Sequence, residues 1–430
     1  MAGETRLGEV ADIIMGQSPP GETYNQRGEG LPFFQGVADF NYRHPTPRVF
    51  CSAPSRIALP GDILLSVRAP IGRVNVADRK CAIGRGLSII RPKRQEDGRY
   101  LEFALRMQEP NWTTIEGSGS VFGNATRRDL EELVVPWPEG ASERRAIAHI
   151  LGTLDDKIEL NRRMSETLEA MAQALFKAWF VDFEPVRAKI EGRWQRGQSL
   201  PGLPAHLYDL FPARLVDSEL GEIPEGWEVA RVDDLCARVE NGGTPRRMEP
   251  IYWGGSIPWF KTGELTDGPL LASEETITEE GLSSSSCKLW PIGTILIALY
   301  ASPTVGRLGI LEVPAAANQA CSALLARPEY GNLFLFYTLL ATRERLQQIA
   351  VGAAQQNISQ QAVRDHKVIV PPAAIARAFH DSAEALYRRR VGLISESRTL
   401  AALRDALLPK LIRGEIRVKD AERFLKERGL

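Results

Sequence analysis

Hydrogen-bonding side chains are concentrated in segments rich in glycine, proline and asparagine, where the chain is expected to form loops. Arginine matches the guanine edge, asparagine and glutamine match adenine, and arginine or lysine also neutralises phosphates. Any single arginine is more often part of an ordinary solvated surface. The side chains that together could form a DNA interface are Gln17, Ser18, Tyr24, Arg68, Arg73, Arg85, Ser118, Asn124, Arg127, Arg128, Thr244, Lys261, Tyr300, Arg307, Gln319, Gln355, Gln356, Asn357 and Gln360.

The amide-rich run at residues 355–361 is the most specific of these signals. It follows Gly352 and precedes an apolar run at residues 368–370. Its amides suit adenine. Asn357 or Ser359 could equally cap a short helix that begins after Ser359, and one segment can fill both roles.

Sequence motifs of catalysis are absent. The sequence contains no phosphate-binding Gly-x-x-x-x-Gly-Lys-Ser/Thr loop, no His-Glu-x-x-His, no Gly-x-Ser-x-Gly and no Asn-Pro-Pro-Tyr/Phe. The five histidines are isolated, and the five cysteines form no Cys-x-x-Cys pair. Asp62 lacks a downstream Glu-x-Lys and is expected to cap a turn. We therefore predict no catalytic residue and no metal site, with a nuclease or methyltransferase of unrecognised site as the alternative.

Overall composition sets wider limits. The 430 residues suggest about three folding units. A net charge of −1 argues against non-specific coating of nucleic acid but permits a local basic face. The longest apolar stretch, residues 294–301, is far shorter than the roughly 20 residues of a membrane helix, and the start lacks a signal-peptide core. A cytoplasmic protein is expected.

The elements that must position the polar loops occur twice in the chain. Residues 60–65 are echoed by 291–296, each a turn followed by an apolar run, and residues 87–92 by 323–328. Two loops are aligned in the same way: residues 123–126 stand opposite 356–359, and 84–86 opposite 320–322. An internal repeat of this period predicts two similar domains.

Two long segments, residues 142–183 and 374–416, follow the two repeats and are expected to be helices. Apolar residues recur in them at alternating spacings of four and three, as in a heptad seam. Polar residues, among them Arg390 and Arg404, interrupt the seam. The alternative is an ordinary amphipathic helix packed on its own domain. The apolar seam positions are Leu154, Ile158, Leu168, Leu175, Leu386, Leu393, Leu400 and Leu407.

These observations predict a mixed α/β fold, in which two pseudo-repeated, strand-rich α/β domains are separated by two long antiparallel coiled-coil-like helices. The expected parts are a first domain at residues 1–140, a first helix at 141–186, a linker at 187–227, a second domain at 228–372, and a second helix with a tail at 373–430.

Several segments together resemble the specificity subunit of type I restriction-modification enzymes. They are residues 16–36, which begin Gly-Gln-Ser-Pro-Pro-Gly, residues 242–265 with the Tyr-Trp-Gly-Gly-Ser motif, and the helix segments 154–186 and 407–418. The resemblance covers essentially the whole chain. It implies two target recognition domains, each of which reads one half of a bipartite, asymmetric site on double-stranded DNA, and no catalysis by this chain.

The same resemblance implies partners. The helices, with their seam residues, would dock two modification (methyltransferase) subunits, and a restriction (helicase-nuclease) subunit would join them in phage defence. S-adenosylmethionine, ATP and Mg²⁺ are expected on these partners and no cofactor on this chain. Because the two repeats differ in their loops, different half-sites are expected. A scaffold that binds only proteins is a further alternative.

Overall fold

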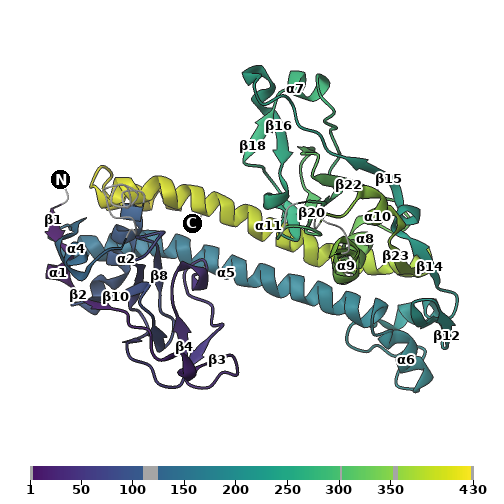
Figure 1. Cartoon of the computed structure of the whole chain (residues 1–430), viewed down its shortest axis with the longest axis horizontal. Coiled ribbons are helices and arrows are strands. Elements are labelled where there is room, and N and C mark those ends of the chain that lie inside the picture. Colours follow the sequence, from purple (N-terminus) through teal and green to yellow (C-terminus); the bar gives the residue numbers. More distant parts are fainter. Residues whose placement is uncertain (1–2, 110–123, 301–302, 352–356, 428–430) are drawn as a thin grey trace. The chain divides into compact units, whose positions relative to one another are not determined.

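The computed structural model describes residues 3–109, 124–300, 303–351 and 357–427 (Figure 1). Ser118, Gln355 and Gln356, which belong to the expected DNA interface, lie outside these ranges. The chain divides into two compact units, one formed by Met1–Arg163 with Glu396–Leu430 and the other by Met164–Ser395. Each unit contains one strand-rich domain and part of each long helix.

The first unit is built from two sheets and a strand pair. Its strands are β1 Glu4–Arg6, β2 Ala11–Met15, β3 Tyr24–Asn25, β4 Leu31–Phe34, β5 Phe50–Cys51, β6 Ile57–Ala58, β7 Ile63–Ser66, β8 Val74–Val76, β9 Cys81–Ile83, β10 Leu87–Pro92 and β11 Val134–Pro136. Its helices are α1 Leu7–Val10, α2 Gly98–Gln108, α4 Arg127–Glu132, α12 Val418–Lys426 and parts of α5 Ala141–Phe180 and α11 Ala373–Ile412. The sheet orders are β2-β10-β7-β8 and β3-β5-β4-β9-β6, and β1 pairs with β11.

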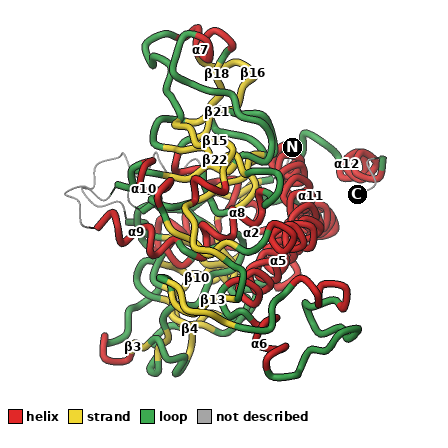
Figure 2. Tube along the Cα trace, turned by 90° about the vertical axis from the view of Figure 1, so that its right-hand side faces the viewer, coloured by secondary structure: helices red, strands yellow, loops and turns green. Residues whose placement is uncertain are grey.

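The second unit has a closely related plan. Its strands are β12 Leu215–Ser218, β13 Gly221–Pro224, β14 Glu228–Arg231, β15 Cys236–Asn241, β16 Trp253–Phe260, β17 Gly268–Leu270, β18 Glu275–Ile277, β19 Ile295–Ala298, β20 Leu308–Leu311, β21 Ala316–Ala317, β22 Cys321–Ala326 and β23 Lys367–Val370. Its own helices are α6 Glu184–Ile190, α7 Glu279–Ser283, α8 Asn332–Ala341, α9 Arg343–Val351 and α10 Gln360–Asp365. The sheet orders are β15-β22-β19-β20-β17 and β18-β16-β21. Figure 2 shows the smaller sheet projecting from the larger one, with α7 at its outer end.

The internal repeat is confirmed as a structural repeat. The antiparallel order β2-β10-β7-β8 recurs as β15-β22-β19-β20. The parallel pair of β4 with β9 recurs as β16 with β21, and the pair of β1 with β11 recurs as β14 with β23. Thr126 caps α4 and Ser359 caps α10, each by accepting a backbone N–H three residues on. The mixed α/β class with two similar strand-rich domains is therefore correct.

Both long helices have clear sequence boundaries. α5 begins shortly after Pro138, and α11 begins directly after Pro372. Proline disfavours helix in the residue before it and is well suited to a helix start. α11 ends where Gly414 adopts φ 71° and donates its N–H to Leu411 O, since glycine tolerates this left-handed conformation.

The two helices pack together in the first unit. Leu154 and Ile158 of α5 share a buried cluster with Leu400 and Leu407 of α11. The polar contacts run in opposite order along the two helices, since Asp155 pairs with Arg404 and Asn161 with Glu396. The helices are therefore antiparallel, as predicted.

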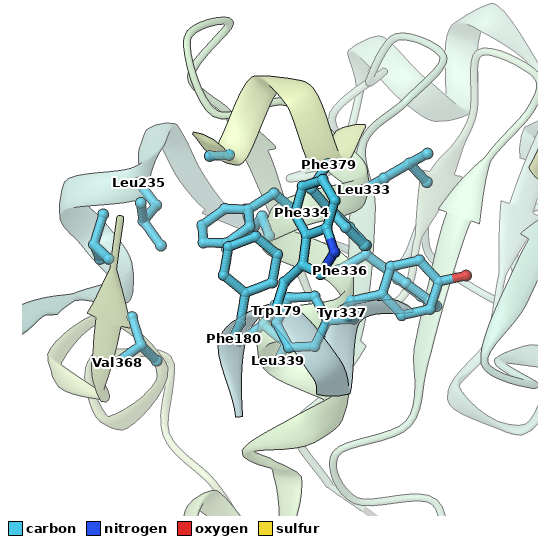
Figure 3. Packing of buried hydrophobic residues seen from close by; sticks show 14 of the residues in the cluster. Trp179, Phe180, Leu235, Leu333, Phe334, Phe336, Tyr337, Leu339, Val368 and Phe379 are labelled. Carbon is cyan, nitrogen blue, oxygen red and sulfur yellow. The ribbon is translucent and has the colours of Figure 1, made fainter. Parts of the chain in front are cut away.

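The same antiparallel pairing holds in the second unit. Here α5 contributes Phe176, Trp179 and Phe180 to the largest buried cluster (Figure 3). Phe180 meets Phe379 of α11 edge to face, with ring centroids 5.3 Å apart, and Glu169 pairs with Arg390. Aromatic pairs of this geometry add to the stabilisation from apolar burial. Five of the eight apolar seam positions are fully buried, whereas Leu168, Leu175 and Leu386 are half-buried.

The placement of domain boundaries at residues 140, 186, 227 and 372 stays a prediction, because division of the chain by contacts cuts both long helices near their middle. Among the described residues, no helix is both long and apolar enough to span a membrane.

One histidine should make the second unit sensitive to acid. His366 is buried at the end of α10, and burial, assisted by nearby Arg345, lowers its pKa to about 4. In the unfolded chain the His366 imidazole is protonated with its ordinary pKa of about 6.5. Neutral His366 therefore contributes fully to the free energy of unfolding above pH 6.5, and this contribution is lost as the pH falls towards 4. We expect His366→Gln to remove up to about 3 kcal/mol of the pH dependence of the free energy of unfolding in this window.

Urea unfolding followed by tryptophan fluorescence at pH 4 to 8 measures this effect. The difference between the parent and His366→Gln at pH 8 reports the change in packing alone, because both side chains are then neutral. A variant whose stability falls as steeply as that of the parent between pH 6.5 and 4 would contradict the assignment.

Candidate nucleic-acid interface

Several expected DNA-contacting residues of the first unit meet at one end of its four-stranded sheet, β2-β10-β7-β8. We call residues 16–18, 67–68, 84–86 and 124–125 the first loop cluster. Its segments are held together by main-chain hydrogen bonds, which fix their positions independently of side-chain identity. These bonds run from Gly16 N to Leu87 O (2.9 Å), from Gln17 N to Ile83 O (3.2 Å), from Val67 N to Gly86 O (3.0 Å) and from Ala125 N to Val67 O (3.0 Å).

The second unit contains an equivalent arrangement. We call residues 242–244, 299–300, 318–320 and 357–358 the second loop cluster. The same pattern of main-chain hydrogen bonds connects its segments, so each segment has a counterpart in the first loop cluster. The bonds run from Gly242 N to Cys321 O (3.0 Å), from Gly243 N to Ala317 O (2.9 Å), from Leu299 N to Ala320 O (2.7 Å) and from Ile358 N to Leu299 O (2.9 Å).

The first residue of each loop cluster is a glycine, and the reason is steric. A Cβ on Gly16 would lie 2.1 Å from Gly84 O, and a Cβ on Gly242 would lie 2.1 Å from Asn318 O. No side chain fits at this distance, so the first loop approaches the turn after β9 or β21 only through glycine. The two Gly-x-Ser/Thr-Pro motifs thus serve the same close approach.

The hydrogen bonds confirm one predicted loop alignment and correct the other. Ala125 and Ile358 make the same bond, so residues 124–126 do stand opposite 357–359; Gly123 and Gln356, at the start of the predicted alignment, lie outside the described residues. Residues 84–86, however, stand opposite 318–320 and not 320–322. The sequence alignment matched Pro92 with Pro328, but Pro92 is the last residue of β10, whereas Pro328 lies two residues beyond the end of β22. Arg85 therefore corresponds to Gln319.

The side chains of the two clusters differ at equivalent places. Gln17, Arg68, Arg85 and Asn124 are exposed in the first cluster, where Ser18 Oγ accepts a hydrogen bond from Arg85 N (3.4 Å). In the second cluster Tyr300 and Gln319 are exposed, Thr244 and Asn357 are half-buried, and the Thr244 hydroxyl donates to Gln319 Oε1. Each unit thus presents its own set of donors and acceptors on a shared main-chain frame.

The predicted DNA-contacting arginines and lysines differ in whether an acidic residue pairs with them. Neither Arg68 nor Arg85 forms an ion pair with any residue that the structure describes. Other predicted cations are paired: Arg73 with Glu109, Arg127 with Glu131, Arg128 with Glu132, and Lys261 with Glu274 and Glu275.

The structure does not bring every predicted residue into a cluster. Tyr24 donates its hydroxyl to Pro19 O, next to the first cluster, and Gln360 donates to Ser322 Oγ, next to the second. Arg127 and Arg128 lie on α4, Arg73 precedes β8, and Arg307 is half-buried before β20.

One exposed residue was missed by the sequence reasoning. Gln35 directly follows β4 as Lys261 directly follows β16, and the backbone N–H groups of both residues donate to a carboxylate a few residues on, Asp39 and Glu264. The signal was present in the sequence, because Phe33-Phe34-Gln35 has the same pattern as Trp259-Phe260-Lys261. It could be recognised only once the repeats were correctly aligned.

No grouping of three or more potential metal ligands exists among the described residues. The five cysteines are buried free thiols, and burial raises the pKa of Cys81, Cys236 and Cys321 to about 12. These thiols are poor nucleophiles and metal ligands because both roles require the thiolate.

Comparison with known proteins now assigns the chain to a class. Residues 3–170 and 224–384 match the family described as type I restriction modification DNA specificity domain, so the chain belongs to this family and carries its domain twice. The chain is 26% identical over 430 residues to the type I restriction enzyme MjaIX specificity subunit of Methanocaldococcus jannaschii, covering 96% of this chain and 93% of that protein.

Two further comparisons agree. The HindI specificity subunit of Haemophilus influenzae is 27% identical over 358 residues, which cover 73% of this chain and 77% of that protein. In structure, the chain is similar to the type I restriction-modification S subunit of M. genitalium, with a TM-score of 0.60, 16% sequence identity and coverage of 95% of each chain. The structural likeness supports the fold.

Proposed function

We propose that this chain is the DNA-reading subunit of a type I restriction-modification complex and that each loop cluster contacts one half of a bipartite, asymmetric DNA site. The observation that carries the proposal is the repeated main-chain frame with different exposed side chains, since Arg68 and Arg85 in one unit correspond to Tyr300 and Gln319 in the other. A shared frame lets two domains engage DNA in the same manner, whereas different side chains select different bases.

In this proposal the chain reads DNA in the cytoplasm and performs no chemistry. Two modification subunits bring S-adenosylmethionine, a restriction subunit brings ATP and Mg²⁺, and the two long helices provide the docking surface. The antiparallel packing of α5 with α11 within each unit supports this role, because each unit then offers a comparable two-helix surface to which one copy of a partner could bind.

Selection of bound sequences from a random double-stranded DNA pool tests the proposal. The full chain, alone and reconstituted with its modification subunits, should enrich a motif with two separate halves. Failure to enrich any motif would favour a protein-only scaffold. Cutting or methylation of DNA by the chain alone, with Mg²⁺ and S-adenosylmethionine present, would favour the enzyme alternative.

Two classes of variant should behave differently in the same assay. We expect Asn357→Ala, and likewise Gln356→Ala, to relax one position of the motif at a cost of about 1–3 kcal/mol, because a base contact is lost. We expect Lys261→Ala to weaken binding to all sequences and to lower the salt dependence, because a phosphate contact is lost. Binding titrations at several salt concentrations measure both effects.

Lys367→Ala is a matched control for Lys261→Ala. Both lysines lie in the second unit and pair with glutamate, but Lys261 follows Phe260, whose carbonyl accepts from Asn318 N of the second loop cluster, whereas Lys367 lies on β23. If Asn357→Ala left both the selected motif and the affinity unchanged, the loop that contains Asn357 would have a structural role only.

A further inference from the structure

The geometry points to Arg85 and Gln319 as equivalent base-reading side chains, with Arg85 selecting guanine in one half-site and Gln319 selecting adenine in the other. This inference rests on the proposed function and specifies which position carries the difference between the two half-sites.

The equivalence of the two residues rests on hydrogen bonds on both sides of each. Gly84 N donates to Phe34 O (2.8 Å), and Asn318 N donates to Phe260 O (2.9 Å). One residue later the chain carries Arg85 or Gln319.

Each of these residues then occupies the same place in a tight turn. Leu87 N donates to Gly84 O (3.1 Å), and Cys321 N donates to Asn318 O (3.0 Å), so each segment is a β-turn closed between its first and fourth residues. Arg85 and Gln319 occupy the second position, and both side chains are exposed. The turn fixes the base of each side chain and so reduces the entropy lost when the side chain binds.

The chemistry of each side chain matches a different base. The Arg85 guanidinium forms no ion pair with the described residues, so its donors are available to the O6 and N7 acceptors of guanine. Gln319 presents one acceptor and one donor group, which match the N6 donor and N7 acceptor of adenine.

A neighbouring hydroxyl orients the amide in the second cluster. The Thr244 hydroxyl donates to Gln319 Oε1, which fixes the oxygen side of the amide and leaves its second lone pair and both N–H groups for a base. Ser18 has the corresponding place beside Arg85, but it receives the Arg85 backbone N–H. Thr244 is thus a positioning residue for Gln319, whereas the Arg85 side chain needs no such orientation because all of its polar groups are donors.

Exchange of the two side chains tests the inference. Arg85→Gln and Gln319→Arg are prepared in the full chain, reconstituted with its modification subunits, and subjected to the same selection from random DNA. Arg85→Gln should convert one position of one half from guanine to adenine preference, and Gln319→Arg should convert one position of the other half in the reverse sense. A bidentate contact should discriminate between the two bases by roughly 5- to 150-fold.

Arg94→Gln is the matched control in the first unit. Arg94 is an exposed arginine beyond the far end of β10, the strand that begins next to the turn of Arg85. The control variant should enrich the motif of the parent. Thr244→Val adds a second readout, since loss of the orienting hydroxyl should reduce adenine preference at the Gln319 position and leave the other half unchanged.

The outcomes separate this inference from the proposed function. If the parent enriches a bipartite motif and both exchanges leave every position unchanged, the assignment of Arg85 and Gln319 is overturned while the proposed function stands. A uniform loss of affinity without a change in motif would identify phosphate contacts and would also overturn it. If the parent enriches no motif, the proposed function fails and the inference fails with it.

Discussion

Asp155→Ala is expected to lower the free energy of unfolding of the first unit by about 3–5 kcal/mol, because it removes the anion at the centre of a buried charged network. The Asp155 carboxylate is completely inaccessible to solvent. It accepts hydrogen bonds from Tyr42 Oη (2.9 Å), Arg106 (3.0 Å) and Arg404 (2.6 Å). Without it, Arg106 keeps Glu102 and Arg404 keeps only the exposed Asp405 as counter-charge, so positive charge in a poorly hydrated site is left undercompensated.

The network extends beyond this carboxylate, which is why its loss should be costly. Glu102 is buried beside it and forms ion pairs with Arg43, Arg99 and Arg106. Burial raises the pKa of Glu102, and the arginines oppose that effect. Burial, together with the nearby Asp155 carboxylate, also raises the pKa of Tyr42, so its hydroxyl stays protonated and keeps donating.

The neighbouring aspartate provides a matched control. Asp156 also contacts Arg43 (3.2 Å) and Arg99 (2.8 Å), but its side chain is 64% exposed. Solvent screens an exposed pair, so Asp156→Ala should cost less than about 1 kcal/mol. Urea unfolding of both variants measures the difference. Equal losses for the two substitutions would show that burial of the charge is not what makes Asp155 important.

Two interhelical ion pairs account for the polar interruptions of the apolar seam. Arg404 and Arg390 interrupt the apolar seam of α11, and they pair with Asp155 and Glu169 of α5. Both pairs are two heptads apart along each helix, and in both the acid is on α5 and the arginine on α11. Polar contacts at seam positions specify register and orientation at some cost in stability.

Much of this architecture could be predicted because it depends on local patterns. The helices were expected at residues 142–183 and 374–416 and begin at Ala141 and Ala373, since proline segments and a sustained heptad pattern mark them strongly. The repeat of strands was recognisable because buried β-branched runs recur in the same order.

The charged network could not be predicted because its members are far apart in the sequence. Tyr42, Glu102, Asp155 and Arg404 come from four separate segments, and only Arg404, by its place in the apolar seam, has a sequence signal that distinguishes it from a solvated residue. The pairing of Arg127 and Arg128 with glutamates of their own short helix was, in contrast, visible as spacings of four residues.

The loop clusters were only partly predictable for a related reason. Candidate residues could be chosen by type, but their meeting depends on main-chain bonds between distant segments, such as Ala125 with Val67. The counterpart of Arg85 was misassigned because a turn has no periodic pattern to align. Main-chain hydrogen bonds define that register, whereas residue identities do not.

Exchange of the first recognition domain should change one half of the DNA site and leave the other half intact. In this chimera, residues 1 to about 140 are replaced by the corresponding segment of another family member. The exchanged segment contains the whole first loop cluster, whereas the second loop cluster keeps all its residues. The two clusters consist of different residues in different units, so their contributions to binding should be nearly additive. The methylation profile of cells that express the chimera with its partner subunits measures the result.

The charged network decides which exchanges will succeed. Tyr42 and Arg106 lie in the exchanged segment, whereas Asp155 and Arg404 lie in the retained helices. An incoming domain that offers no hydroxyl or cation at these two places leaves Asp155 with Arg404 as its remaining partner among these three and should fold poorly, because a buried carboxylate that loses hydrogen bonds is costly. We therefore expect a chimera that preserves Tyr42 and Arg106 to be stable and to methylate a new first half, and one that replaces both with alanine to be unstable.

The reciprocal exchange of residues 228–372 is the control, and it should change only the other half of the site. A chimera of the first domain that altered both halves, or only the half assigned to the second domain, would contradict the assignment of one unit to one half-site. A stable, active chimera without Tyr42 and Arg106 would instead show that the network is dispensable for holding the recognition domain on the helices, because Arg404 alone would then suffice to neutralise Asp155.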